Sequence, residues 1–235
     1  MTKTLLRARV LHLALALALF ASLASAQSLT TTYASNNGQS GNMFDIETIA
    51  NGVIVNDFDV NLASITAGAT VDVWAITGGG TFIGNENNAA AWTLRGSAPV
   101  TAAGTASPTN LGLNLGYLVA PASRQGFYLT VSTGTGFQYR TGNVTGEFFD
   151  DIFVSDTFLH IRCGIGKSST GYSSTTPSFG TSNFGGFTPG VSQARVWCGT
   201  VYYTPSSGLA DDIAVTSVSA PVDSVACEFL SATEA

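Results

Sequence analysis

The sequence predicts an all-β protein: an antiparallel β-sandwich of jelly-roll type, with about ten short strands and little helix. Three observations support this prediction. Runs rich in Thr, Val, Phe and Tyr recur at short intervals, and Gly, Asn and Ser separate them. No segment carries the 3.6-residue apolar period of an amphipathic helix.

The first half of the chain contains four expected strands. A Thr-rich run at 28–34 ends at the polar turn SNNGQSGN, and the run 43–50 meets the next run, 53–63, across Asn51-Gly52. Asn-Gly is the strongest short hairpin signal. The run 70–77 alternates apolar and polar residues and stops at three glycines.

Within 53–63 the period of two is clear and assigns the faces of the strand. It predicts an inward face made of Ile54, Phe58, Val60 and Leu62. Asp57, Asp59 and Asn61 are expected on the opposite face.

The second half adds five expected strands. In 111–119 the leucines at 111, 113 and 115 share one face. The runs 126–132 and 136–142 are expected to form a hairpin across Thr-Gly-Thr-Gly, and the runs 158–165 and 194–204 are expected to close the domain.

Residues 1–26 predict a secretory signal peptide. Basic residues precede a short apolar stretch at 10–20, and Ala24-Ser25-Ala26 supplies a small-residue cleavage site. That stretch reaches only about half of a bilayer core, so it predicts no transmembrane segment. We expect the mature protein to begin near Gln27 and to be secreted, extracellular or at the cell surface.

The chain beyond the signal peptide divides into three parts. Residues 27–204 are enough for one well-cored β domain. Residues 205–210 are a polar linker, and 211–235 are too short to form a core, so we expect a truncated second domain there.

Charge limits the function. Without residues 1–26, six cations face fifteen acidic residues, a formal net charge of −9, so no basic surface for nucleic acid is expected. His160 and Lys167 are then the only histidine and the only lysine. Because acid–base and metal chemistry near neutral pH depends on these residue types, the sequence predicts a protein that is not an enzyme.

Cys163 and Cys198 lie in strand-like runs of an exported chain, where disulfides form. Cys163 shares strand parity with Leu159 and Ile161 and is expected to face the core. A Cys163–Cys198 disulfide would close a loop of about 35 residues and stabilise the fold by about 3–4 kcal/mol. The alternative is two independently buried thiols. In both cases the role is structural.

Four carboxylates cluster in or near the segment GEFFDDIFVSD, and they are candidate calcium ligands: Glu147, Asp150, Asp151 and Asp156. No EF-hand loop or other calcium repeat is present, and a solvated loop is the alternative. The sequence otherwise predicts no cofactor.

Trp74 and Asp72 are candidate ligand-binding residues. They share one face of the 70–77 run, opposite Val71, Val73 and Ala75, and an exposed Trp ring there could stack on a sugar. Lys167 follows a glycine-rich stretch that lacks the first glycine of a phosphate-binding loop, so we expect a solvated lysine in a turn. His160 is expected to face solvent beside Arg162.

Four stretches together resemble an N-terminal module of large exported bacterial proteins. They are YASNNGQSGNMFDI, AAWTLRGSAPV, LGLNLGYLVAPASRQGFYLTV and RVWCGTVYYT, which span about residues 29–204. The resemblance implies a β-sandwich and carries no activity. The module does not require the two cysteines.

The tail is similar to the start of bacterial Ig-like adhesion modules of the CARDB type. The match rests on Asp212-Ile213-Ala214-Val215 as a first strand, on Ser219-Ala220-Pro221, and on Cys227, Leu230 and Glu234 after it. It implies a longer multidomain protein whose absent part holds any partner of Cys227.

These observations favour a non-catalytic structural or adhesion module at the front of a longer surface or secreted protein. The alternative is a carbohydrate-binding accessory module of a secreted hydrolase. Extracellular glycans, other surface proteins and downstream domains of the same chain are the expected partners. A third hypothesis, an enzyme that uses Asp150 and Asp151, needs both carboxylates in one cleft.

Overall fold

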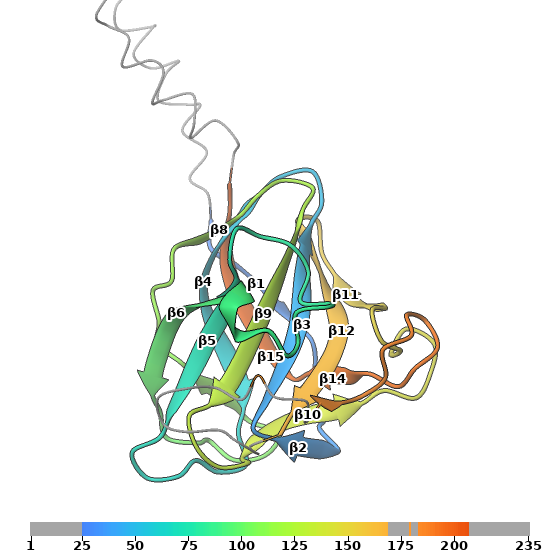
Figure 1. Cartoon of the computed structure of the whole chain (residues 1–235). Helices are drawn as coiled ribbons and strands as arrows, with labels where there is room; N and C mark the ends of the chain where they lie inside the picture. Colours follow the sequence, from blue (N-terminus) through green and yellow to red (C-terminus); the bar gives the residue numbers. More distant parts are fainter. Residues whose placement is uncertain (1–24, 169–178, 180–182, 207–235) are drawn as a thin grey trace, which may run out of the picture.

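The computed structural model describes residues 25–168, 179 and 183–206, and this part of the chain is all-β. Two antiparallel sheets confirm the predicted sandwich (Figure 1). Among the described residues the only helical segment is one 3-10 turn, η1 (Ala89–Ala91). The expected second domain at 211–235 with Cys227, nearly all of the signal peptide and most of the linker lie outside the described residues.

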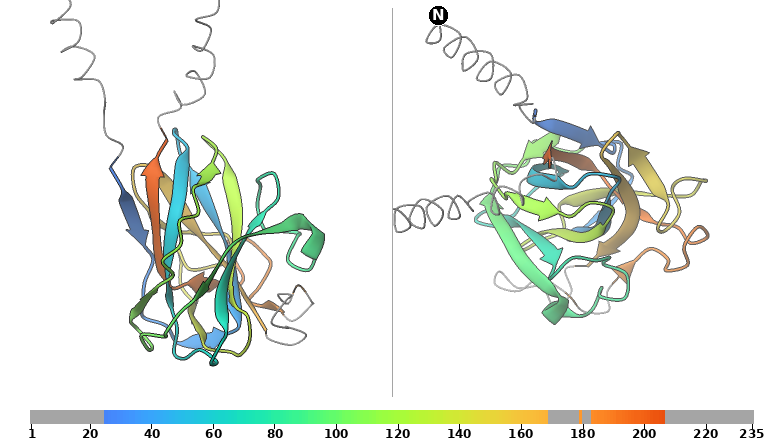
Figure 2. Two further views of the ribbon diagram at one scale, coloured as in Figure 1. Left: turned by 90° about the vertical axis from the view of Figure 1, so that its left-hand side faces the viewer. Right: turned by 90° about the horizontal axis from the view of Figure 1, so that it is seen from above.

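The smaller sheet is built around β4. Its strand order is β1 (Gln27–Thr30), β15 (Gly199–Pro205), β4 (Val53–Asn61) and β7 (Pro108–Asn110), with β8 (Tyr117–Val119) also pairing with β4. Figure 2 shows β1 and β15 side by side at its edge. Gln27 is opposite Tyr203, so the described chain enters and leaves the sandwich at the same end.

The larger sheet carries the remaining strands. Its order is β2 (Asn37–Gln39), β10 (Phe137–Thr141), β14 (Arg195–Trp197), β12 (Leu159–Lys167), β3 (Gly41–Thr48), β9 (Arg124–Val131), β5 (Thr70–Ile76) and β6 (Trp92–Pro99). Two further strands, β11 (Ile152–Ser155) and β13 (Asn183–Phe184), pair with β12. The short strands make the total larger than the sequence predicts. Both predicted hairpins are wrong, because β3 and β4 lie in different sheets and β9 and β10 do not pair with each other.

The main core fills the space between the sheets. Phe44 of β3 stacks on Trp197 of β14 with ring centroids 4.4 Å apart and planes 6° apart. Phe58 of β4 meets the Trp197 ring edge-on at 5.6 Å, which joins the two sheets. All three side chains are fully buried or nearly so.

A second apolar cluster covers the outer face of the larger sheet. Met43, Tyr128 and Ile165 of the sheet pack there against residues from the connecting segments, including Phe82 and Phe149. Figure 1 shows the segment around η1 lying over β5 and β9. Apolar clusters therefore pack on both faces of the larger sheet, whereas the smaller sheet has one face outside the two clusters.

A β-bulge changes the predicted inward face of β4. Phe58, Val60 and Leu62 are fully buried as predicted, but Ile54 is only half-buried and Val53 and Val55 face the core instead. The register to β15 shifts between Tyr202 and Tyr203, which gives β4 one extra residue. Because side chains alternate along a strand, one extra residue reverses the faces beyond it.

The expected strand at 111–119 is wrong over its first part. Only Tyr117–Val119 is a strand, as β8. Gly112 and Gly116 have φ values of 65° and 56°, in the left-handed region that interrupts an extended chain. Leu111 and its two neighbouring leucines still pack against the main core.

Candidate functional site

The outer face of the smaller sheet carries rows of polar side chains. Strand register places Thr30, Thr200, Asp59 and Asn110 in one row across β1, β15, β4 and β7. The adjacent row contains Ser28, Tyr202 and Asp57. We call these seven residues the polar face. Its edge residues are exposed, Tyr202 and Asp57 are partly exposed, and the central Asp59 and Thr200 are nearly buried.

Hydrogen bonds fix the side chains of the polar face. The Asn110 amide donates to Asp59 Oδ1 at 2.7 Å and to Asp57 Oδ2 at 3.1 Å. The Tyr202 hydroxyl donates to Asp59 Oδ2 at 2.8 Å. This hydrogen bond, with burial, raises the pKa of Tyr202 to about 12, so the phenol is protonated at neutral pH. The face therefore presents oriented carboxylate, amide and hydroxyl groups of net negative charge.

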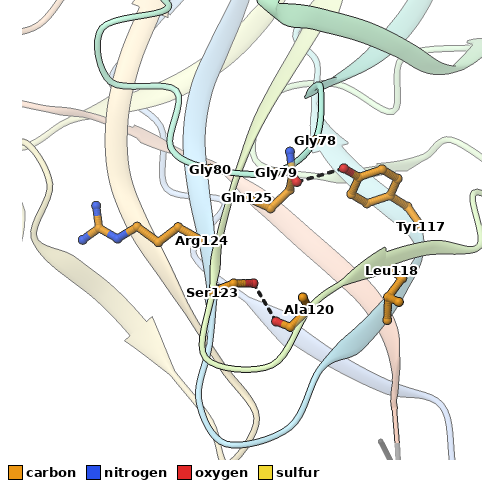
Figure 3. A pocket seen from close by; sticks show the side chains of 9 residues that line it. All are labelled: Gly78, Gly79, Gly80, Tyr117, Leu118, Ala120, Ser123, Arg124 and Gln125. Carbon is orange, nitrogen blue, oxygen red and sulfur yellow. Dashed lines mark hydrogen bonds between the residues drawn. The ribbon is translucent and has the colours of Figure 1, made fainter. Parts of the chain in front are cut away.

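A hollow of about 240 Å³ lies beside the start of β9 (Figure 3). Its lining residues are Gly78, Gly79, Gly80, Tyr117, Leu118, Ala120, Ser123, Arg124 and Gln125. The Tyr117 hydroxyl donates to Gln125 Oε1 at 2.8 Å, and Figure 3 shows the Arg124 side chain directed away from this pair. The three glycines have φ values of 78°, 87° and 107°, so this wall is backbone that only glycine adopts readily. Among its lining residues Arg124 is the one charged side chain, so no carboxylate or histidine lines the hollow to act with it as an acid–base pair.

A network of charged side chains lies on the larger sheet near the hollow. Arg124 pairs with Asp150 at 2.9 Å and Glu47 at 3.2 Å, and Asp45 lies 3.6 Å from it. Arg162 pairs with the same Glu47. Burial alone would raise the pKa of Glu47, but the hydrogen bond and charge of Arg162, with those of Arg124, lower it below its ordinary value.

Asp45 is the buried member of this network. Its burial leads us to expect that the free energy of unfolding depends on pH in an unusual direction. Burial raises the pKa of Asp45 to about 6, against the hydrogen bonds that it accepts from Thr81 and Phe82. The folded protein thus holds this proton more tightly than the unfolded chain. The Asp45 contribution to the free energy of unfolding should fall by about 2–3 kcal/mol as the pH rises from about 4 to about 6.

Urea unfolding of the wild type and of Asp45→Asn between pH 4 and pH 7 measures this effect. Relative to the wild type, the variant should gain stability across that window, because it has no carboxyl to titrate. Parallel pH profiles for the two proteins would contradict the assignment. Glu47 is present in both and cancels in the difference.

In the structure each of the four calcium candidates is engaged by other protein groups. Glu147 pairs with Arg140 at 3.0 Å, Asp150 belongs to the charged network, and Asp151 accepts hydrogen bonds from the backbone of its own loop. Asp156 accepts hydrogen bonds from two backbone amides and from the Tyr203 hydroxyl. In the described part of the chain no three His, Cys, Asp or Glu side chains gather in a way that could hold a metal ion.

Trp74 and Asp72 lie on the same face of β5, opposite Val71 and Val73, as the period predicts. Trp74 is half-buried in the second cluster and meets the Phe179 ring edge-on at 5.7 Å. Asp72 is nearly buried and accepts hydrogen bonds from Thr70 and Ser97. The Trp74 ring is therefore part of an apolar cluster and not a flat exposed platform.

The predicted Cys163–Cys198 disulfide is wrong, because both residues are buried free thiols. The register of β12 to β3 shifts between Arg162 and Ile165. This irregularity turns Cys163 away from the main core and into the second cluster, on the far side of the larger sheet. Burial raises the pKa of both thiols to about 12.

The two basic side chains expected in solvent behave differently. His160 lies at the surface with Nδ1 2.6 Å from Ser155 Oγ, and among the described residues no carboxylate is hydrogen-bonded to its ring. Lys167 is not solvated: its side chain is fully buried at the end of β12. Its Nζ donates to Glu86, Asn87 and Asn183.

No protein-family model matches this sequence, and no curated protein matches it. Among the described residues, no helix is long and apolar enough to span a membrane.

Proposed function

We propose that the chain is an exported, non-catalytic module of a secreted or cell-surface protein, with a structural or adhesive role. Its contact surface is the polar face. The observation that carries the proposal is the difference between the two sheets: apolar clusters pack on both faces of the larger sheet, and one face of the smaller sheet carries aligned polar rows.

The arrangement of acidic residues supports a binding role over catalysis. Asp57 and Asp59 both accept hydrogen bonds from Asn110, and Asp59 also accepts one from Tyr202. Such bonds hold the carboxylate oxygens in fixed positions as acceptors. At the other acidic cluster, the Asp150 carboxylate pairs with Arg124 and the Asp151 carboxylate accepts a hydrogen bond from its own loop, which supports a structural role for both.

The composition of the polar face also favours the second candidate, a carbohydrate-binding accessory module. Carboxylates, carboxamides and phenols are complementary to the hydroxyl groups of sugars. Because Asp57 and Asp59 repel anions, a neutral glycan fits this face better than an acidic one. The Trp74 ring, in the second cluster, is not needed for this mode of binding.

Two substitutions on the polar face test the proposal. With the full chain, we expect binding to neutral glycans on an array and co-sedimentation with neutral insoluble polysaccharides. Asn110→Ala and Tyr202→Phe should each weaken binding about tenfold, since each removes a hydrogen bond to a carboxylate.

Matched controls come from elsewhere on the molecule. Tyr117→Phe alters the hollow, and Asn114→Ala alters an exposed amide outside the polar face, so both should bind like the wild type. If Tyr117→Phe abolishes binding while Tyr202→Phe does not, the contact surface is the hollow. Binding to cell walls without binding to any isolated glycan would favour the adhesive role over the accessory one.

A further inference from the structure

A buried amine lies against two side-chain carboxamides where β12 meets β13. Lys167 Nζ donates to the Glu86 carbonyl oxygen at 3.0 Å, to Asn87 Oδ1 at 3.3 Å and to Asn183 Oδ1. Lys167 and Asn183 are also direct partners in the antiparallel register of the two strands. The Asn183 amide is held in turn, because its Nδ2 donates to Asn87 Oδ1 at 3.0 Å.

The surroundings of this amine make its neutral, nucleophilic form more populated than that of an exposed lysine. Burial lowers the pKa of Lys167 to about 8, although the charge of Glu86 acts in the opposite direction. At pH 7 about a tenth of the Lys167 side chains then carry an unprotonated amine. A desolvated neutral lysine is a competent nucleophile toward a carbonyl carbon.

We propose that Lys167 and Asn183 join in an intramolecular isopeptide bond. The Nζ lone pair attacks Cγ of Asn183, the new C–N bond forms, and the bond from Cγ to Nδ2 breaks. A proton passes from Nζ to Nδ2, and ammonia leaves. The reaction exchanges one amide for another, so it needs no oxidant, reductant or external reactant.

Neighbouring residues have distinct parts in this step. Asn87 is a positioning residue, because its Oδ1 contacts both Nζ and Nδ2. The Glu86 carboxylate is nearly buried, and its negative charge acts on Nζ from a distance. Glu86 is fixed in turn by the Gly84 N–H, which donates to its Oε1 at 3.0 Å.

The isopeptide bond would connect the two ends of the segment that contributes Phe179 to the second cluster. It links Lys167 to Asn183, and Phe179 lies between them in the chain. The Phe179 ring packs with Trp74, Trp92 and Tyr128. A covalent link at this point restricts the unfolded chain in the way a disulfide does, and reduction does not break it. The two free thiols make no such link.

Trypsin digestion of the folded, then denatured, full chain provides the test. Unmodified Lys167 is a cleavage site, so digestion would release peptides 163–167 and 168–195. With the bond, cleavage after Lys167 is lost, and a single peptide 163–195 should appear that is lighter than its sequence mass by one ammonia. Fragmentation of that peptide locates the link.

The controls separate the bond from other losses of ammonia. Asn183→Ala should restore cleavage after Lys167, and Lys167→Met should restore the full mass of the corresponding peptide. If these variants do not fold, the peptide map of the folded wild type still shows whether the Lys167–Asn183 bond is present. Complete release of 163–167 from the wild type would overturn the proposal, and so would a link from Lys167 to Asn87.

Discussion

Replacing Phe44 with alanine is expected to lower the free energy of unfolding by about 3–5 kcal/mol. Phe44 is fully buried, stacks on Trp197 at 4.4 Å, and lies within 6.4 Å of both the Phe58 and Phe127 rings. Its removal leaves a cavity at the point where the two sheets meet. Urea unfolding followed by tryptophan fluorescence measures the change.

Phe187→Ala is the matched control for this prediction. Phe187 is 49% exposed and contacts Phe149 at 5.8 Å, so its truncation removes far less buried area. We expect a loss of about 1 kcal/mol or less. Equal losses for the two variants would show that Phe44 is not at the centre of the core.

Gly164→Ala is the second substitution with a large expected effect. A Cβ at this position would lie 1.7 Å from the Met43 carbonyl oxygen and 2.7 Å from its carbonyl carbon. Gly164 lies between β3 and β14 at the register shift of β12. Because backbone and not a flexible side chain occupies the space, the strands must separate locally. We expect a loss of about 3 kcal/mol or more.

Gly104→Ala separates this steric effect from backbone strain. Gly104 has a φ of 100° and no atom within 4 Å of an added Cβ, so only its backbone conformation is disfavoured for alanine. That substitution should cost about 1–2 kcal/mol. If Gly164→Ala costs no more than this control, the close approach of β12 to β3 is wrong.

The alternation of apolar and polar residues in 53–62 correctly predicts most of the buried face of β4. Phe58, Val60 and Leu62 are buried as expected, and Asp57 and Asp59 lie on the outer face. The alternation gives the wrong face for Ile54, because a β-bulge in the pairing of β4 with β15 adds one residue to β4. That pairing partner lies about 150 residues away in the chain, and no local pattern specifies where it shifts.

A second bulge accounts for the wrong disulfide. Strand parity places Cys163 with Leu159 and Ile161, and the shift between Arg162 and Ile165 reverses it. The burial of Lys167 was missed for a related reason. A lone lysine after Gly-Ile-Gly has the composition of an exposed turn, and its acceptors come from residues 86–87 and from β13.

The polar face could be predicted only in part. Asp57 and Asp59 appear in the alternation of one strand, but Asn110 and Tyr202 join them through pairing with β7 and β15. The arginine network had no local signal. Arg124 and Asp45 come from neighbouring strands β9 and β3, and Asp150 from a loop.

Mapping of ligand contacts by NMR on the isotope-labelled full chain tests the central claim most directly. The probe is the neutral oligosaccharide that binds most tightly on the glycan array. Saturable shifts at Asp57, Asp59, Asn110, Thr200 and Tyr202, with none at Gly78–Gly80, are the predicted result. Shifts confined to the hollow, or no saturable shift with any array-positive oligosaccharide, would contradict the assignment of the polar face as the contact surface.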